Sequence, residues 1–455
     1  MPEVSKKCLS SGYNHNQNYM AKIINFSDYP LFAESCFTNF NNDEYYYSTV
    51  FGAIDTSFPW KELERYFSGK FKHKKLKDGR PRVFKPEVEI KLLILKSLTG
   101  WSDKRILEAL AENWVVQRFC RVSLLERYEN TGILSDIRER YAAVARIEEL
   151  QDIFAKHWSD YLSLIEGVLL DATVFSSNIK YPDEIELLWD SIEWVKSRVD
   201  LLRQVLRKGR LRTSYLKVKD AYYRVKTNRR ATNRQKRKLV KRELYLLQKY
   251  LEAYEELINS GAVKELSDFE QKRYETIKLV YHQRRAKFLG QKVKNLILSL
   301  PKPYVRSIYR GKARGKWEYG EKYHLFMLGD MVFIDKISNE NYNETKRLKS
   351  VVELSEQYIG GRLKYLGADK IYWSRANRRY LKEKNIKENF VPLGRPVLDR
   401  EYRAQQMLLK SEINKARNSI MEGVIGDLKT HYYTERVRER SGGRETDYIF
   451  RTNVS

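Results

Sequence analysis

The first part of the chain has the hydrophobic period of short helices. After Phe58-Pro59-Trp60 the apolar residues recur every three to four positions, and one helical face over 86–98 carries Val88, Leu92, Leu95 and Leu98. Gly100 interrupts this pattern, and Ser102 is a good N-cap for the helix that follows it. The pattern predicts an all-α domain over residues 51–160. Helices of this size are equally typical of a DNA-binding helix-turn-helix motif and of an all-α packing and dimerisation domain.

A second pattern, in which short apolar runs alternate with helical segments, predicts a mixed α/β domain over 161–183 and 301–440. Val168-Leu169-Leu170-Asp171 has the form of a buried strand that delivers a carboxylate at its C-terminal edge. Another predicted strand ends at Asp369, and a long late helix carries Glu422. Strands are predicted at 168–171, 322–328, 331–334 and 363–368. Helices are predicted at 342–358, 374–384 and 402–429.

Residues 184–300 interrupt this domain with a long basic helical insertion. Residues 201–250 hold 18 Lys and Arg against two acids, Asp220 and Glu243. The apolar residues that follow form one helical stripe, made of Leu239, Val240, Leu244, Leu247, Leu251, Tyr254, Leu257 and Ile258. Polar residues 227–233 predict the turn of a helical hairpin. The basic side of this hairpin is predicted to bind DNA phosphates. The alternative is that it is an ordinary solvated surface. The residues predicted to bind DNA are Arg229, Arg230, Lys236, Arg237 and Lys238.

Composition narrows the class of protein. The 455 residues carry a net charge of +27, and 42% are hydrophobic, which excludes wholesale disorder and favours a polyanionic partner, most simply nucleic acid. No uncharged apolar run spans a membrane, and no secretion signal is visible. Cys8, Cys36 and Cys120 are too scattered for a disulfide framework or a zinc site and suit the reducing cytosol. Residues 1–50, rich in Asn, Tyr and Ser, predict a poorly ordered leader.

Three carboxylates on separate elements, Asp171, Asp369 and Glu422, offer a metal site. Carboxylate oxygens suit Mg²⁺, and two such ions about 3.5–4 Å apart stabilise both oxygens in a displacement at phosphorus. The six His are dispersed, so no imidazole cluster competes. The alternative is that these are ordinary solvent-facing acids, since the chain has 59 Asp and Glu.

At these residues the sequence resembles bacterial insertion-sequence transposases of the DDE type, the insertion-sequence-five/four-like group with an RNase H-like core. Leu169-Leu170-Asp171-Ala172-Thr173 and the downstream Ile179-Lys180-Tyr181-Pro182-Asp183 are similar to the first-Asp block. Lys316-Trp317-Glu318-Tyr319-Gly320 resembles the second-strand block, and Ala368-Asp369-Lys370-Ile371-Tyr372 the second-Asp block. Glu422-Gly423, with Gly426 and Lys429 after it, resembles the final Glu block. The similarity covers about residues 51–440.

The resemblance implies that Asp171, Asp369 and Glu422 hold two Mg²⁺ ions, for which Mn²⁺ can substitute. It implies cleavage of double-stranded DNA at the ends of an insertion sequence, followed by strand transfer into target DNA. The enzyme would then work as a homodimer in the cytoplasm, at the nucleoid, with no membrane partner.

The resemblance also implies roles for side chains around the acids. Lys429 would pair with a terminal phosphate, unless it is an ordinary solvated lysine. Arg417 would also approach the DNA. Relatives carry an Arg four residues before the Glu, whereas this chain has Asn418 there and Arg417 five before. Trp373 would stack on an unpaired base, with a core or surface position as the alternative.

Other functions remain open from the sequence. Relatives continue with an apolar helix where residues 441–455 form a polar tail, the pattern of a truncated end. A catalytically decayed or repurposed DNA-binding protein of the same fold is therefore an alternative. A nuclease that cuts without joining and a basic scaffold for acidic partners are two more.

Overall fold

The computed structural model describes residues 43–71, 83–122, 127–260, 266–309, 317–394, 398–431 and 436–437. The chain divides after Phe58 into two compact units. In the first, α3 (Asp43–Ser48) and α4 (Val50–Ser57) meet at Thr49, whose hydroxyl caps α4 by accepting from the Gly52 N–H at 3.1 Å. The leader predicted over 1–50 is thus helical from residue 43, and its earlier part lies outside the described residues.

The second unit begins with short helices, as the hydrophobic period predicts. Their bounds are α5 (Trp60–Lys70), α6 (Pro86–Thr99), α7 (Asp103–Glu112), α8 (Trp114–Cys120), α9 (Gly132–Val144), α10 (Ile147–His157) and α11 (Ser159–Leu162). Gly100 ends α6 with a left-handed φ of 62°, and the Ser102 hydroxyl accepts from the Arg105 N–H at 3.2 Å to start α7. Cys120 is buried.

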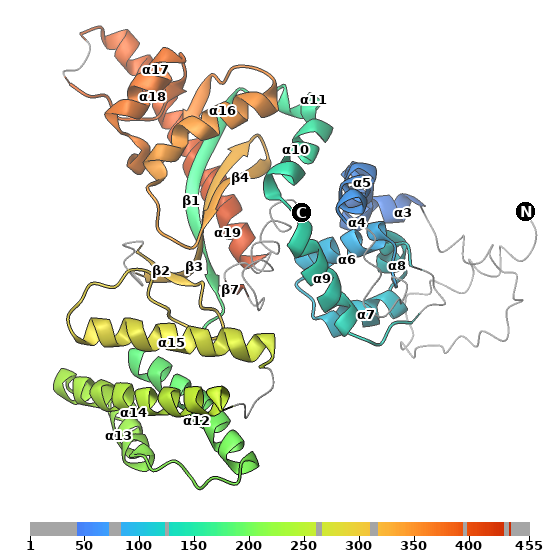
Figure 1. Cartoon of the computed structure of the whole chain (residues 1–455). Coiled ribbons are helices and arrows are strands. Elements are labelled where there is room, and N and C mark those ends of the chain that lie inside the picture. The colour runs from blue at the N-terminus through green and yellow to red at the C-terminus, as the bar shows by residue number, and fades with distance from the viewer. Residues whose placement is uncertain are drawn as a thin grey trace, which may run out of the picture. The chain divides into compact units, whose positions relative to one another are not determined.

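The described strands form one mixed sheet (Figure 1). Its strands are β1 (Gly167–Ser177), β2 (Arg306–Tyr309), β3 (Trp317–Leu328), β4 (Met331–Ser338), β5 (Tyr365–Gly367), β6 (Lys387–Glu388) and β7 (Arg436–Val437). β3 is antiparallel to β1 and to β4, whereas β1 and β5 are parallel, as are β5 and β6. β2 and β4 share one edge of β3, and β5 and β7 share one edge of β1.

The prediction that Asp171 ends its strand is wrong. β1 continues six residues further, to Ser177. The antiparallel partner β3 supports this extension, because the pairing runs from Val168 opposite Leu328 to Ser176 opposite Gly320. The parallel partner β5 pairs only with residues 167–169. Asp171 therefore lies just beyond the point where one neighbouring strand stops.

Helices cover both faces of the sheet. Val168 and Leu170 point to the face where a buried apolar cluster joins them to α10, α11 and α16 (Leu348–Ile359). The side chain of Gln151 on α10 fixes that helix to β4, since it donates to the Ile334 carbonyl at 3.0 Å and accepts from the Ile334 N–H at 2.6 Å. Asp171 points to the opposite face, because side chains alternate along a strand.

One long helical segment lies against that opposite face. It consists of α18 (Arg400–Ala416), the π-helical turn η4 (Arg417–Met421) and α19 (Glu422–Thr430), where a single helix over 402–429 is predicted. Gly367 at the end of β5 permits the close approach, since a Cβ there would lie 2.8 Å from Leu169 Cδ2 and 3.1 Å from Ile413 Cγ2. The smaller helical pieces are η2 (Glu344–Arg347), η3 (Lys370–Tyr372) and α17 (Arg375–Glu383).

The insertion is larger than the predicted hairpin. Its described helices are α12 (Glu184–Val205), α13 (Tyr215–Thr227), α14 (Asn233–Asn259) and α15 (Asp268–Phe288), and they share a core of their own. The predicted turn over 227–233 is confirmed, as is the apolar stripe on α14, of which Leu239 to Leu257 are buried and Ile258 is partly buried. Thr232 and Gln235 form a capping box at the start of α14.

Candidate active site

Asp171 on β1 and Asp369, two residues beyond β5, are equally far from a paired position of these neighbouring strands. Leu169 of β1 pairs in parallel with Gly367 of β5, and each acid follows two residues later. Neighbouring strands lie about 4.8 Å apart, so the two acids lie near each other where β5 ends, while β1 continues past Asp171 to Ser177. Asp369 also caps η3, where its Oδ1 accepts from the Lys370 N–H at 2.7 Å.

Arg417 connects Asp171 to Glu422. Its Nη2 donates to Asp171 Oδ2 at 3.2 Å, and its Nη1 lies 3.5 Å from Glu422 Oε1. The Arg417 and Asp171 side chains are only 11% and 19% exposed, whereas Glu422 is 59% exposed. The guanidinium is therefore largely removed from solvent and lies between two of the three predicted acids.

The π-turn explains how Arg417 reaches Glu422. In an α-helix, residues four apart lie one above the other, whereas a π-turn closes with a bond between residues five apart. Since η4 spans Arg417–Met421, the five-residue spacing to Glu422 places both side chains on one face. Asn418, at the four-residue position, is exposed and accepts from Arg417 Nη1 at 2.7 Å. The hydrophobic pattern does not reveal this turn.

A buried polar network that the sequence did not indicate lies beside the acids. His324, opposite Ala172 in the β1–β3 pairing, contacts Asp335 Oδ2 through Nδ1 and the Tyr372 hydroxyl through Nε2, both at 2.7 Å. Arg347 donates to both oxygens of Asp335 at 2.8 and 2.7 Å. Burial opposes ionisation of Asp335, but hydrogen bonds from His324, Arg347 and Ser350 hold the pKa of that carboxyl well below its usual range. The network joins β3, β4, η2 and η3.

The donor set suits a hard divalent cation. Asp171, Asp369 and Glu422 offer only carboxylate oxygens, which Mg²⁺ prefers. The Arg417 guanidinium already places a positive charge between two of them. Within the described ranges, however, no three His, Cys, Asp or Glu side chains gather closely enough to hold an ion as they stand. Loading a metal would require these carboxylates to turn toward one another.

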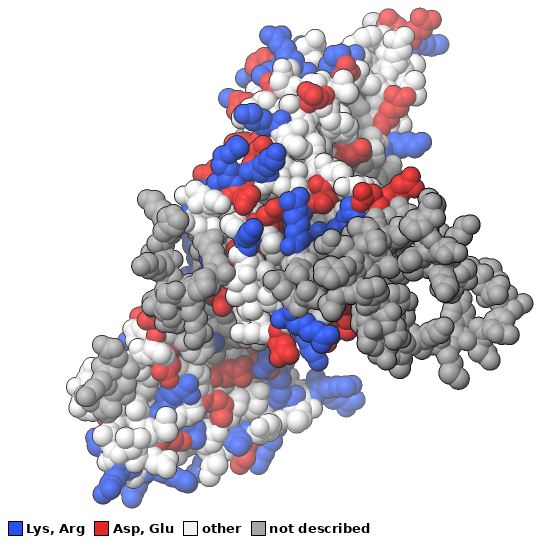
Figure 2. Space-filling view, turned by 90° about the vertical axis from the view of Figure 1, so that its right-hand side faces the viewer, with Lys and Arg blue, Asp and Glu red and all other residues white. Residues whose placement is uncertain are grey.

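The other predicted site residues lie in several places. Lys429 is half-buried on α19, seven residues after Glu422. Trp373 is half-buried, packs on Phe390 with ring centroids 5.6 Å apart and donates to the Ala368 carbonyl at 3.4 Å. Lys and Arg side chains gather along the lower margin of Figure 2. The helices of the insertion, α12 to α15, lie at the bottom of Figure 1. All five predicted basic residues of the insertion are exposed: Arg229, Arg230, Lys236, Arg237 and Lys238.

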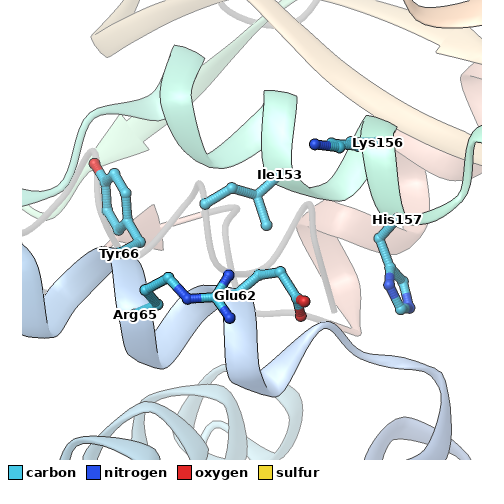
Figure 3. A pocket seen from close by; sticks show the side chains of 6 residues that line it. All are labelled: Glu62, Arg65, Tyr66, Ile153, Lys156 and His157. Carbon is cyan, nitrogen blue, oxygen red and sulfur yellow. The ribbon is translucent and has the colours of Figure 1, made fainter.

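A separate pocket of about 600 Å³ lies between α5 and α10 (Figure 3). Its walls carry both signs of charge and one apolar side chain, from Glu62, Arg65, Tyr66, Ile153, Lys156 and His157. Near this pocket, the Tyr66 hydroxyl accepts from the Arg146 N–H at 3.0 Å, and Lys70 forms an ion pair with Glu149. These contacts attach α5 to the start of α10. The pocket shares no residue with the carboxylate site.

Among the helices of the described residues, none is long and apolar enough to cross a membrane. No curated protein and no solved structure matches the chain. Residues 44–140 match a protein family described as "Transposase domain (DUF772)". The match covers the N-terminal helices from α3 to most of α9 and ends before the strand that carries Asp171. It supports a transposase of the insertion-sequence type.

Proposed function

We propose that this protein is a DDE transposase with an RNase H-like core, which binds the ends of an insertion sequence and performs DNA cleavage and strand transfer. One observation carries the proposal: Asp171 and Asp369 each follow two residues after the paired Leu169 and Gly367 of parallel β1 and β5, and Arg417 connects Asp171 to Glu422. The transposase domain at residues 44–140 gives independent support.

The sheet topology supports the RNase H-like part of the proposal. Antiparallel β4, β3 and β1 are followed by parallel β5 and β6, in the order β4-β3-β1-β5-β6. The helix with the third acid covers the sheet face to which Asp171 points. The insertion leaves after β1 and returns before β2, so it interrupts the core without separating the paired strands.

In the proposed reaction, Asp171, Asp369 and Glu422 hold divalent ions. Two Mg²⁺ ions supply charge stabilisation for the attacking and leaving oxygens at phosphorus. Asp171 and Asp369 are positioned by the β1–β5 pairing and by the cap of η3, and Glu422 by the helix that covers the sheet. Lys429, two helical turns after Glu422, supplies a cation for a phosphate of the bound DNA.

The insertion is the proposed surface for the DNA ends. Its exposed basic residues lie in the α13–α14 turn and the first turns of α14, while the opposite face of α14 is buried in the insertion's own core. Lys and Arg on such a surface bind phosphates without reading sequence. Binding of two ends, and hence a dimer in the active complex, belongs to the same proposal.

A cleavage and joining assay tests this function. The full chain is incubated with a duplex carrying the inverted repeats that flank its own coding region, with Mg²⁺ or EDTA. We expect Mg²⁺-dependent nicking at the repeat boundary and joined products, both lost in Asp171→Asn and Glu422→Gln. Glu401→Gln, an exposed acid on α18, is the matched control and keeps activity. Nicking without joined products indicates a nuclease, and salt-sensitive binding without nicking indicates a decayed DNA-binding protein.

A further inference from the structure

We propose that Arg417 is a built-in counter-cation of the acid site, which competes with divalent metal ions for Asp171 and Glu422. The inference rests on the proposed function in that it takes these acids as metal ligands. It adds a regulatory element: the site carries its own cation, and a metal ion must displace it. The concentration of metal at which the site fills is then set by a residue of the chain.

The contacts of Arg417 support displacement rather than a permanent structural role. One amino group contacts Asp171 at 3.2 Å and the other lies 3.5 Å from Glu422, both long for charge-assisted hydrogen bonds. Its buried Nε has no hydrogen-bond partner in the described part of the chain. By contrast, Arg347 donates to both Asp335 oxygens at 2.8 and 2.7 Å. The shortest contact of the guanidinium is the 2.7 Å hydrogen bond from Nη1 to Asn418 Oδ1, and its contacts with the two carboxylates are longer and easier to break.

The π-turn η4 positions the Arg417 guanidinium next to the acids. π-helical turns are rare and occur mostly as single turns near functional sites. Without the turn, the residue on the Glu422 face would be Asn418, a neutral side chain. Ile413, one turn before Arg417, packs toward Gly367, so the backbone here is held against the end of β5. A charge at position 417 therefore reaches the acids, whereas a charge at 418 faces solvent.

Electrostatics sets the direction of the effect. Asp171 is mostly buried and Glu422 is mostly exposed, and both carry a negative charge next to the Arg417 guanidinium, which reduces the repulsion between them. Removing Arg417 takes one compensating positive charge away from these acids in EDTA, which lowers the stability of the metal-free protein. A divalent ion then enters without displacing a guanidinium, so it binds more tightly. Coupling between competing ligands of this kind typically changes affinity about 5-fold or more.

The test is Mn²⁺ and Ca²⁺ titration of the full chain without DNA, by calorimetry and by electron paramagnetic resonance of Mn²⁺. We compare the wild type with Arg417→Met, which keeps the apolar stem, and with Arg403→Met, an exposed arginine on α18, as the control. A double variant, Arg417→Asn with Asn418→Arg, moves the charge by one residue. We expect affinity about 5-fold tighter in Arg417→Met and in the double variant, and unchanged in the control.

Thermal unfolding in EDTA provides a second readout. Arg417→Met should unfold at lower temperature than the wild type in EDTA, and saturating Ca²⁺ should remove the difference. If Arg417→Met does not fold, Arg417→Lys keeps the charge on a point-like ammonium and should give an intermediate affinity.

Equal or weaker metal affinity in Arg417→Met overturns the inference, as does wild-type behaviour of the double variant. If the wild type binds metal and Asp171→Asn abolishes binding, these outcomes leave the proposed function intact. If neither the wild type nor Arg417→Met binds metal, the inference and the metal-dependent function both fail.

Discussion

The Nε2 atom of His324 lies 2.7 Å from the hydroxyl oxygen of Tyr372, in the interior of the α/β core. His324 stands on β3 beside the strand that carries Asp171, and Tyr372 ends the short helix that Asp369 caps. Both side chains are fully buried. The contact therefore connects the structural surroundings of the two acids.

Tyr372→Phe should lower the free energy of unfolding by about 1–2 kcal/mol, because it leaves a buried imidazole nitrogen without its partner. It should also weaken metal binding, since η3 loses its tether to β3. Urea unfolding and Mn²⁺ titration measure the two effects. Tyr402→Phe removes an exposed hydroxyl and is the control. Unchanged stability would mean that the hydrogen bond contributes nothing to the core.

Glu243 should make the stability of the insertion depend on pH. It is fully buried on α14, neither carboxylate oxygen has a hydrogen-bond partner among the described residues, and burial, with Asp183 and Glu184 nearby, raises its pKa to about 9. The unfolded value is about 4.3, so the folded state favours the protonated form. Its contribution to stability is full below about pH 4.3 and falls as the pH rises toward about 9.

Glu243→Gln should therefore raise the melting temperature at pH 8 and flatten this part of the pH dependence. Thermal unfolding followed by circular dichroism between pH 5 and 9 measures it. The exposed Glu252→Gln on the same helix should leave the profile unchanged. A profile of Glu243→Gln that is parallel to the wild type would show that this carboxyl does not titrate differently on folding.

Gly367→Ala should destabilise the core by about 1–3 kcal/mol, the usual cost of overpacking. The new Cβ would meet the side chains of Leu169 and Ile413, so these packed side chains would have to shift. Gly426→Ala on α19 meets no atom within 4 Å and should be neutral or stabilising. Chemical denaturation compares the two variants, and equal stability would contradict the close packing at Gly367.

Removing the charges at the start of α14 should weaken DNA binding without altering its sequence preference. For the triple alanine variant of Lys236, Arg237 and Lys238, the slope of log affinity against log salt should fall by up to about 3, one for each lost phosphate contact. The variant Lys236→Arg, Arg237→Lys, Lys238→Arg keeps the charge and should bind as the wild type does. Fluorescence anisotropy at several salt concentrations measures the slopes. An unchanged slope in the alanine variant would indicate a merely solvated basic face.

Periodicity and capping chemistry in the sequence determined the local elements. Ser102 starts α7 and the apolar stripe of α14 is buried, because each signal depends on residues within one or two turns. The acid at the end of β5 was predicted for the same reason. The strands β2 and β7 were not predicted, since they are short and owe their conformation to their partners β3 and β1.

The tertiary structure alone decided how these elements combine into a site. Arg417 reaches Asp171 across 246 residues of sequence, through a π-turn that no hydrophobic pattern marks. Pairing with β3 extends β1 beyond Asp171. Packing of α14 in the insertion core buries Glu243, which the sequence shows only as an acid in a basic segment. Local sequence sets the helix or strand propensity of a segment and the pattern of exposed and buried side chains along it. Electrostatic and hydrogen-bonding partners, however, come from whichever distant segments the packed core brings together.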